Sequence, residues 1–244
     1  MITSFIQGGL GNQLFQIAAG YSLADRLDTS FALHHGQHWL PLQGNRIETY
    51  KDNILSKINF EDLSNIKFTR YDYTDAKHLP IPLLDNQILV GYFQSQKYFS
   101  SCKDKIKELF TLKLVDMPKG SVSLHIRRGD YLSNPSIHPT MSADYYKKAL
   151  QSIGSYSEVF VFTDSDLPEG LEDSNITVVS EGTDYEQMGM MASCTHNVIA
   201  NSTFSWWAAY LNQNNGVVVA PKTWYGPKGP KDWQDIYCDN WVVI

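Results

Sequence analysis

The chain has 244 residues, of which 43% are hydrophobic and 13% aromatic, enough apolar material for one large domain or two small ones. Its formal net charge is −6 at pH 7, which argues against a general nucleic-acid-binding protein. Any site for a polyanion must therefore be a local concentration of positive charge.

The cysteines and the N-terminal residues give information on the cellular compartment of the protein. Cys102, Cys194 and Cys238 are far apart and fit neither a disulfide framework nor the spacing of zinc ligands, which indicates a reducing environment. The first residues lack a charged leader followed by a long apolar core, and no later run is long enough to span a bilayer. We therefore expect a cytoplasmic protein without an integral membrane segment.

The first segment of the chain predicts a strand, a turn and a helix. Thr3–Gln7 is strand-like, Gly8–Gly11 is a glycine-rich turn, and apolar residues then recur at helical spacing over Leu14–Ala24. Asn12 stands near the start of this helix. The order is similar to the opening of a nucleotide-binding βα unit, although the glycines do not complete that fingerprint and are also typical of a tight corner.

The middle of the first half is harder to interpret. Residues 31–82 predict little regular structure, because Trp39–Leu42 and Leu79–Pro82 contain prolines that interrupt it. Beyond them, Gln87–Tyr92 predicts a strand and Phe99–Phe110 an amphipathic helix.

The second half alternates more regularly. Met117–Gly120 is the best candidate for a domain boundary, so we expect domains at 1–117 and 118–244. Strands are predicted at Ser121–Ile126, Val159–Phe162, Ile176–Val179, His196–Ala200 and Val217–Ala220. Helices are predicted from about Ser142, from Thr183, where Thr183–Glu186 form a capping box, and over Phe204–Leu211. This alternation predicts an α/β fold with a parallel sheet covered on both faces.

The stretch His125–Tyr131 (HIRRGDY) follows the end of a predicted strand. Arginine presents a rigid fork of donors that matches phosphate oxygens, and ligands of parallel sheets bind beyond the carboxyl ends of the strands. Arg127 and Arg128 therefore indicate a diphosphate clamp. The alternative is a surface ion-pair cluster in which Gly129 and Asp130 form an ordinary turn.

The segment Asn201–Leu211 lies where another predicted strand passes into a helix. Asn201, Ser202 and Thr203 are residue types that cap a helix, and the N-terminus of a helix also attracts anions. A helix cap and a phosphate site are compatible here. Of the adjacent Trp206 and Trp207, at least one is expected in the core.

Phe162–Asp166 also lies at the carboxyl end of a strand. Asp164 and Asp166 have the Asp-x-Asp spacing of metal-dependent sugar transferases. Alternatively, one of them accepts hydrogen bonds from guanine, or the segment only caps a helix. Because an arginine clamp makes a metal redundant, we favour the guanine or cap interpretation.

Taken together, these segments and the Gly8–Gln16 stretch resemble glycosyltransferase family 11, the α-1,2-fucosyltransferases. The resemblance covers nearly the whole chain. It implies a GT-B-like fold, with two Rossmann-like domains facing a cleft, and here the first domain is expected to be reduced because the chain is short. It further implies inverting transfer of L-fucose from GDP-β-L-fucose to the 2-hydroxyl of a galactose in a glycan acceptor, without a metal or other cofactor.

The resemblance also implies roles for individual residues. Arg127, with Arg128 beside it, would contact the β-phosphate, His125 the nucleotide, and Asp164 or Asp166 the guanine. Asn201, Ser202, Thr203 and Phe204 would line the phosphate site, and Asn12, Gly9 and Gly11 would close over the fucose. The family often has a second acid where this chain has Ser165, so both aspartates stay candidates, as do Asp130 and His125 for the general base.

Two other functions compete with this interpretation. The first is a metal-dependent transferase of another nucleotide sugar, using Asp164 and Asp166. The second is a non-catalytic carbohydrate-binding module that stacks its aromatic residues on sugars. The arginine pair argues against the second, since a lectin needs no diphosphate site.

Overall fold

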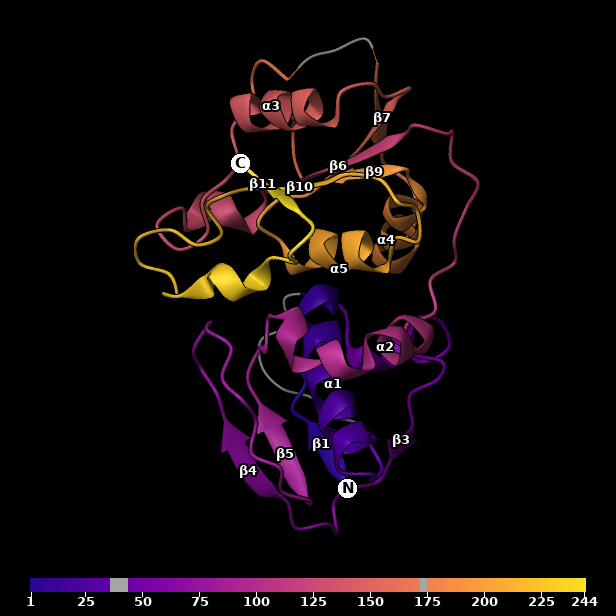
Figure 1. The fold of residues 1–244 in the computed structure, drawn as a ribbon, viewed down its shortest axis with the longest axis vertical. Coiled ribbons are helices and arrows are strands. Elements are labelled where there is room, and N and C mark those ends of the chain that lie inside the picture. Colours follow the sequence, from indigo (N-terminus) through magenta and orange to yellow (C-terminus); the bar gives the residue numbers. More distant parts are fainter. Residues whose placement is uncertain (36–43, 172–174) are drawn as a thin grey trace. The chain divides into compact units, whose positions relative to one another are not determined.

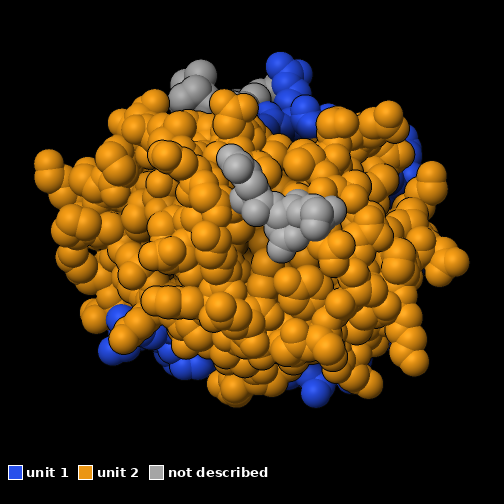
Figure 2. Space-filling view, turned by 90° about the horizontal axis from the view of Figure 1, so that it is seen from above, with its two compact units in different colours: residues 1–112, 234–236 blue, residues 113–233, 237–244 orange. Residues whose placement is uncertain are grey.

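A computed structural model of the protein describes residues 1–35, 44–171 and 175–244. The chain forms two compact units (Figure 2). Unit 1 comprises residues 1–112 and 234–236, and unit 2 comprises residues 113–233 and 237–244. The interruption expected at Trp39–Leu42 lies outside the described residues.

Unit 1 is built on a small parallel sheet (Figure 1). Its strands are β1 (Ile2–Ser4), β2 (Leu33–His34), β3 (Phe60–Glu61), β4 (Thr69–Asp72) and β5 (Gln87–Val90), and its helices are α1 (Leu10–Arg26) and α2 (Lys103–Leu109). The 3-10 helices are η1 (Ile47–Tyr50), η2 (Gln96–Tyr98) and η3 (Ser100–Cys102). The main sheet has the order β1-β5-β4, and β2 pairs with β3.

The predicted opening strand and helix of unit 1 are confirmed. Gly8 has φ +78°, a left-handed conformation that turns the chain sharply into α1. The side-chain amide of Gln16 then secures the turn, accepting from the Gln7 amide at 2.9 Å and donating to the Gln7 carbonyl at 3.0 Å. The apolar face of α1, including Leu14 and Ile17, is fully buried.

Other predictions for unit 1 need correction. The expected helix Phe99–Phe110 begins as η3, and only Lys103–Leu109 is α-helical. Residues 31–82 hold β2, β3 and β4, which the sequence did not indicate, because these strands are short and mostly exposed and so lack an alternating pattern.

Unit 2 contains a six-stranded sheet in which every neighbouring pair is parallel. Its strands are β6 (Val122–Ile126), β7 (Val159–Thr163), β8 (Ile176–Val179), β9 (His196–Val198), β10 (Val218–Ala220) and β11 (Val242–Val243). Its α-helices are α3 (Ala143–Ile153), α4 (Asp184–Ser193) and α5 (Thr203–Leu211). The 3-10 helix η4 (Asp130–Ser133) follows β6, and η5 (Trp233–Ile236) lies between β10 and β11, with residues 234–236 assigned to unit 1. The predicted alternation of strands and helices is confirmed.

The order of these strands is β8-β7-β6-β9-β10-β11. Counted from β6 this is 3-2-1-4-5-6, the order of the doubly wound Rossmann fold. The direction of winding reverses between β6 and β9. Such a reversal opens a crevice beyond the carboxyl ends of the two strands, where ligands bind.

Helices cover both faces of this sheet, with α3 on one side and α4 and α5 on the other (Figure 1). Val122, Leu124 and Ile126 of β6 pack in one cluster with Tyr146 of α3. The alternate residues point the other way, so Ser123 accepts from Asn197 at 2.6 Å and His125 lies against α5.

Several smaller predictions about unit 2 are also confirmed. The carboxylate of Glu186 accepts from the Thr183 amide at 2.9 Å, which forms the expected capping box of α4. Trp206 and Trp207 are both fully buried.

The three cysteines, Cys102 in unit 1 and Cys194 and Cys238 in unit 2, are free and buried. Within the described residues no helix is both long and apolar enough to cross a membrane.

Candidate functional site at the carboxyl ends of β6 and β9

The predicted site residues of unit 2 gather at the reversal of its sheet. β6 ends at Ile126 and leads into the loop Arg127–Asp130, which we call the arginine loop, while β9 ends at Val198 and leads through Asn201 into α5. β7 lies on the other side of β6 and ends at Thr163, directly before Asp164. Three segments that are distant in the sequence thus meet at one edge of the sheet.

Arg127 is held between two carboxylates. One guanidinium nitrogen lies 2.6 Å from Oδ1 of Asp130, and the other lies 2.7 Å from Oδ2 of Asp164. The guanidinium carbon also lies 5.5 Å from the ring centroid of Tyr131, within range of a cation–π interaction. The side chain is still 33% exposed, so its remaining N–H groups can reach a ligand.

Tyr131 links this arginine to the segment after β9. Its hydroxyl donates to the carbonyl of Asn201 at 3.0 Å, one residue before the N-cap of α5. Its ring stacks on His138 at 4.7 Å, and His138 in turn contacts the ring of Tyr225. Sequence reasoning missed His138 and Tyr225, because neither lies in a motif or at a strand end.

Among the described residues, no side chain caps the backbone amides at the N-terminus of α5. Ser202 is the N-cap, but its side chain makes no capping hydrogen bond. The Asn201 carboxamide instead donates to the carbonyls of Pro139 and Trp224, both at 2.9 Å, and so fixes two loops. The amides of the first turn, beginning with Thr203, therefore have no side-chain cap and are suited to an anion.

His125 occupies the buried side of this arrangement. It is 6% exposed, and its ring lies 5.6 Å from that of Phe204, the second residue of α5. Burial, reinforced by the charge of Arg127, lowers the pKa of His125 to about 3. Among the described residues its Nδ1 atom has no hydrogen-bond partner. The imidazole is thus neutral at pH 7 and a weak proton acceptor.

The other predicted residues lie in different surroundings. Both ion pairs of the arginine loop involve Arg127. Arg128 instead lies near Tyr146 of α3: burial raises the pKa of Tyr146, and the charge of Arg128 partly opposes this. Asp166 is exposed. Gly9, Gly11 and Asn12 belong to unit 1, where Asn12 accepts from Gln94 at 2.8 Å. The roles that the resemblance implies for these residues stay predictions.

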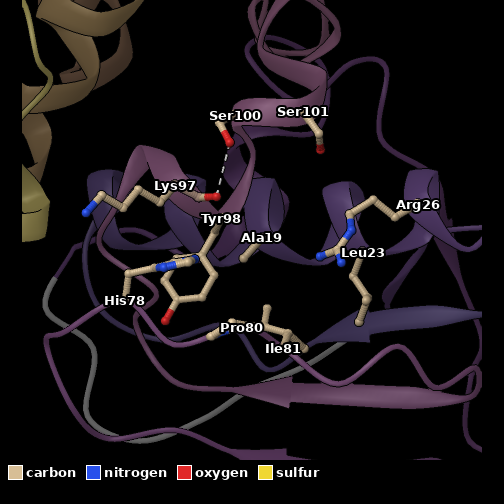
Figure 3. A pocket seen from close by; sticks show the side chains of 10 residues that line it. All are labelled: Ala19, Leu23, Arg26, His78, Pro80, Ile81, Lys97, Tyr98, Ser100 and Ser101. Carbon is tan, nitrogen blue, oxygen red and sulfur yellow. Dashed lines mark hydrogen bonds between the residues drawn. The ribbon is translucent and has the colours of Figure 1, made fainter.

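Unit 1 also has a pocket of about 270 Å³, lined by none of the predicted site residues (Figure 3). Apolar side chains of α1, such as Leu23, form part of its wall, and Arg26, His78 and Lys97 add polar groups. Among the described residues no group of three or more His, Cys, Asp or Glu is arranged to hold a metal ion.

Comparison with known proteins identifies the family. The sequence profile described as glycosyl transferase family 11 matches residues 1–244. The chain belongs to this family. It is therefore a glycosyltransferase, and the resemblance inferred from its motifs is confirmed.

Individual relatives in this family are distant. The O-antigen biosynthesis glycosyltransferase WbnK of Escherichia coli is 26% identical, over 99% of both chains. An alpha-1,2-colitosyltransferase of the same organism is 27% identical over 92% of both chains. The human galactoside alpha-(1,2)-fucosyltransferase 1 is 24% identical over 89% of this chain and 67% of its own.

A solved structure supports the fold. The fucosyltransferase NodZ from Bradyrhizobium matches with a TM-score of 0.50 over 85% of this chain and 92% of its own, at 14% identity. The expected α/β architecture with parallel sheets is thus confirmed. At this identity the likeness concerns the fold alone.

Proposed function

We propose that this family 11 enzyme transfers L-fucose from GDP-β-L-fucose to the 2-hydroxyl of a galactose in a glycan acceptor. Relatives named for α-1,2 transfer of fucose or colitose support the linkage. In this proposal the two units are the two domains of a GT-B-type transferase, and the reaction inverts the configuration at the fucose C1 atom without a metal cofactor.

One observation carries the proposal above all others. Arg127, a helix N-terminus without a side-chain cap and the reversal of a parallel sheet come together in unit 2. Each of these features favours a bound phosphate, and together they match a nucleoside diphosphate better than a neutral glycan. A carbohydrate-binding module has no need for them.

The same groups suit the departure of GDP. When the acceptor hydroxyl attacks C1, the bond from C1 to the β-phosphate oxygen breaks and negative charge gathers on the diphosphate. A guanidinium that is already oriented by Asp130 and Asp164 stabilises that charge without reorganising. The amides of α5 and the hydroxyls of Ser202 and Thr203 add further donors.

Between the two candidates for the general base, Asp130 is favoured. A histidine with a pKa of about 3 gains little from accepting a proton at pH 7, so His125 is better suited to contact the nucleotide as a neutral ring. The carboxylate of Asp130 is 37% exposed. It can therefore take up the proton of the acceptor hydroxyl if the acceptor reaches it.

The proposal is tested by incubating the protein separately with GDP-fucose, GDP-mannose and UDP-galactose, each with and without lactose. We expect GDP release from GDP-fucose only, stimulated by lactose and undiminished by excess EDTA, with an α-1,2 linkage in the NMR spectrum of the product. Release from UDP-galactose, or activity abolished by EDTA and restored by a divalent ion, would favour the metal-dependent alternative. GDP release from a colitosyl donor should also be measured, because one relative is named for transfer of that sugar.

A further inference from the structure

We propose that Asp164 is a positioning residue that shapes the arginine loop for a diphosphate and that it does not read the nucleobase. This inference rests on the proposed function and assigns one of the two candidate aspartates. It differs from the role that the family resemblance implied for Asp164.

Both oxygens of the Asp164 carboxylate are engaged by the arginine loop. Oδ1 accepts hydrogen bonds from the backbone amides of Arg128 at 2.9 Å and of Gly129 at 3.1 Å. Oδ2 lies 2.7 Å from the guanidinium of Arg127. One side chain thus holds three consecutive residues of the loop.

The position of Asp164 in the sheet explains how it reaches them. The last register pair between β6 and β7 joins Ile126 to Thr163, so Asp164 is the first residue beyond the paired strands. Its carboxylate supplies acceptors for the loop amides just past the end of β6. The Thr163 hydroxyl secures the turn that carries Asp164, because it donates to the Ser165 carbonyl at 2.8 Å and accepts from the Ser165 amide at 3.2 Å.

Gly129 crowds one side of this carboxylate, although the Asp164 side chain is still 29% exposed. A Cβ atom at Gly129 would lie 2.7 Å from Oδ2 of Asp164 and 3.1 Å from its carboxyl carbon. Reading guanine requires both oxygens of one carboxylate, facing the N1–H and the exocyclic amine side by side. Asp164 would have to release Arg127 to do this, at the moment when the guanidinium must face the diphosphate.

Asp166 does not carry these constraints. Both aspartates are exposed, but in the described part of the chain the Asp166 carboxylate, two residues further along, has no hydrogen bond or ion pair. Asp166 is therefore the aspartate whose carboxylate is available to bind the guanine base. The two residues have the same side chain, so their different roles follow from their different positions in the turn after β7.

The test measures the affinities of GDP, GMP and IDP by calorimetry for the wild type, Asp164→Ala and Asp166→Ala, and the affinity of UDP for the wild type. The ratio of GDP to GMP affinity reports the β-phosphate, and the ratio of GDP to IDP affinity reports the exocyclic amine of guanine. We expect Asp164→Ala to reduce the ratio of GDP to GMP affinity by about tenfold or more, because Arg127 loses the ion pair that orients it. The ratio of GDP to IDP affinity should not change. Asp166→Ala should reduce the ratio of GDP to IDP affinity and leave the ratio of GDP to GMP affinity unchanged.

The inference is wrong if Asp164→Ala abolishes discrimination against IDP, or if it changes neither ratio. A wild type that binds UDP as well as GDP contradicts the proposed function instead, and the two failures are thus distinguishable. Asp164→Asn is the second variant, in case Asp164→Ala folds poorly. It keeps an oxygen for the two amides, so in the nucleotide-free protein hydrogen exchange at Arg128 and Gly129 should stay slow while the ratio of GDP to GMP affinity still falls. Rapid exchange of these amides in the wild type would also overturn the proposal.

Discussion

The imidazole of His125 packs against the ring of Phe204, with their centroids 5.6 Å apart and their planes inclined by 43°. This contact joins the end of strand β6 to the first turn of helix α5, at the place where the winding of the sheet reverses. It also removes His125 from solvent, which is why burial lowers its pKa from 6.5 to about 3.

The first prediction concerns the pH dependence of stability. Because the pKa of His125 is lower in the folded than in the unfolded chain, its contribution to stability is complete above pH 6.5 and is lost as the pH falls towards 3. Between pH 6.5 and about 3 the free energy of unfolding of His125→Gln should therefore fall less steeply with decreasing pH than that of the wild type. The two slopes should differ by about 1 kcal/mol for each pH unit. Urea unfolding at several pH values checks this. The other histidines are common to both proteins, so parallel curves would contradict the prediction.

The second prediction concerns Arg127. By analogy with arginines that stabilise phosphoryl transfer, Arg127→Ala should lower kcat by about 10³-fold, because the charge on the departing diphosphate loses its guanidinium partner. Arg127→Lys keeps the charge but not the two-pronged geometry that now engages Asp130 and Asp164, and should restore activity only in part. Steady-state kinetics measures both, with circular dichroism as the control for folding. A rate near that of the wild type in Arg127→Ala would remove this residue from the mechanism.

Much of unit 2 was predictable from its sequence. β7 is a nearly continuous apolar run, β6 alternates apolar residues with Ser123 and His125, and α4 has a clear start at Thr183. Because parallel strands end at a common edge, the motifs after them were expected to meet. The strand order was not predictable, since it depends on pairing between segments far apart in the chain.

The contacts inside the site were less accessible to sequence reasoning. A residue type does not reveal whether a carboxylate faces a ligand or a neighbouring loop, and Asp164 and Asp166 look alike in the sequence. Similarly, Asn201 is a residue type that often caps a helix, yet its side-chain amide donates to the carbonyls of Pro139 and Trp224. These choices depend on loops that carry no periodic signal.

The third prediction concerns Gly129. A methyl group there would lie 2.7 Å from Oδ2 of Asp164, which must move and so release Arg127. We expect Gly129→Ala to reduce kcat by about 10²-fold, the scale that a misplaced catalytic group costs. The double variant Gly129→Ala with Asp164→Ala removes the collision, so its kcat should be no lower than that of Asp164→Ala alone. Independent, multiplying effects of the two substitutions would show that the collision is not the cause.

The fourth prediction concerns the segment 234–236, which belongs to unit 1 although it lies near the end of the chain. Asp235 accepts from the His78 amide at 2.8 Å through its side chain and from the Ser95 hydroxyl at 2.6 Å through its carbonyl, and it pairs with Lys97. Asp235→Ala removes both side-chain contacts and leaves the amide of His78 without its acceptor. It should lower the free energy of unfolding by about 1–3 kcal/mol.

The matched control for this substitution is Asp72→Ala. Asp72 is also an aspartate of unit 1 that pairs with a basic residue, Arg70, but both side chains are more than half exposed. Such surface pairs contribute little to stability. Urea unfolding should therefore separate the two variants, with Asp235→Ala clearly less stable than the wild type and Asp72→Ala close to it. If both variants unfold at the same urea concentration, then Asp235 does not anchor the returning segment, and its contacts are no stronger than those of an exposed pair.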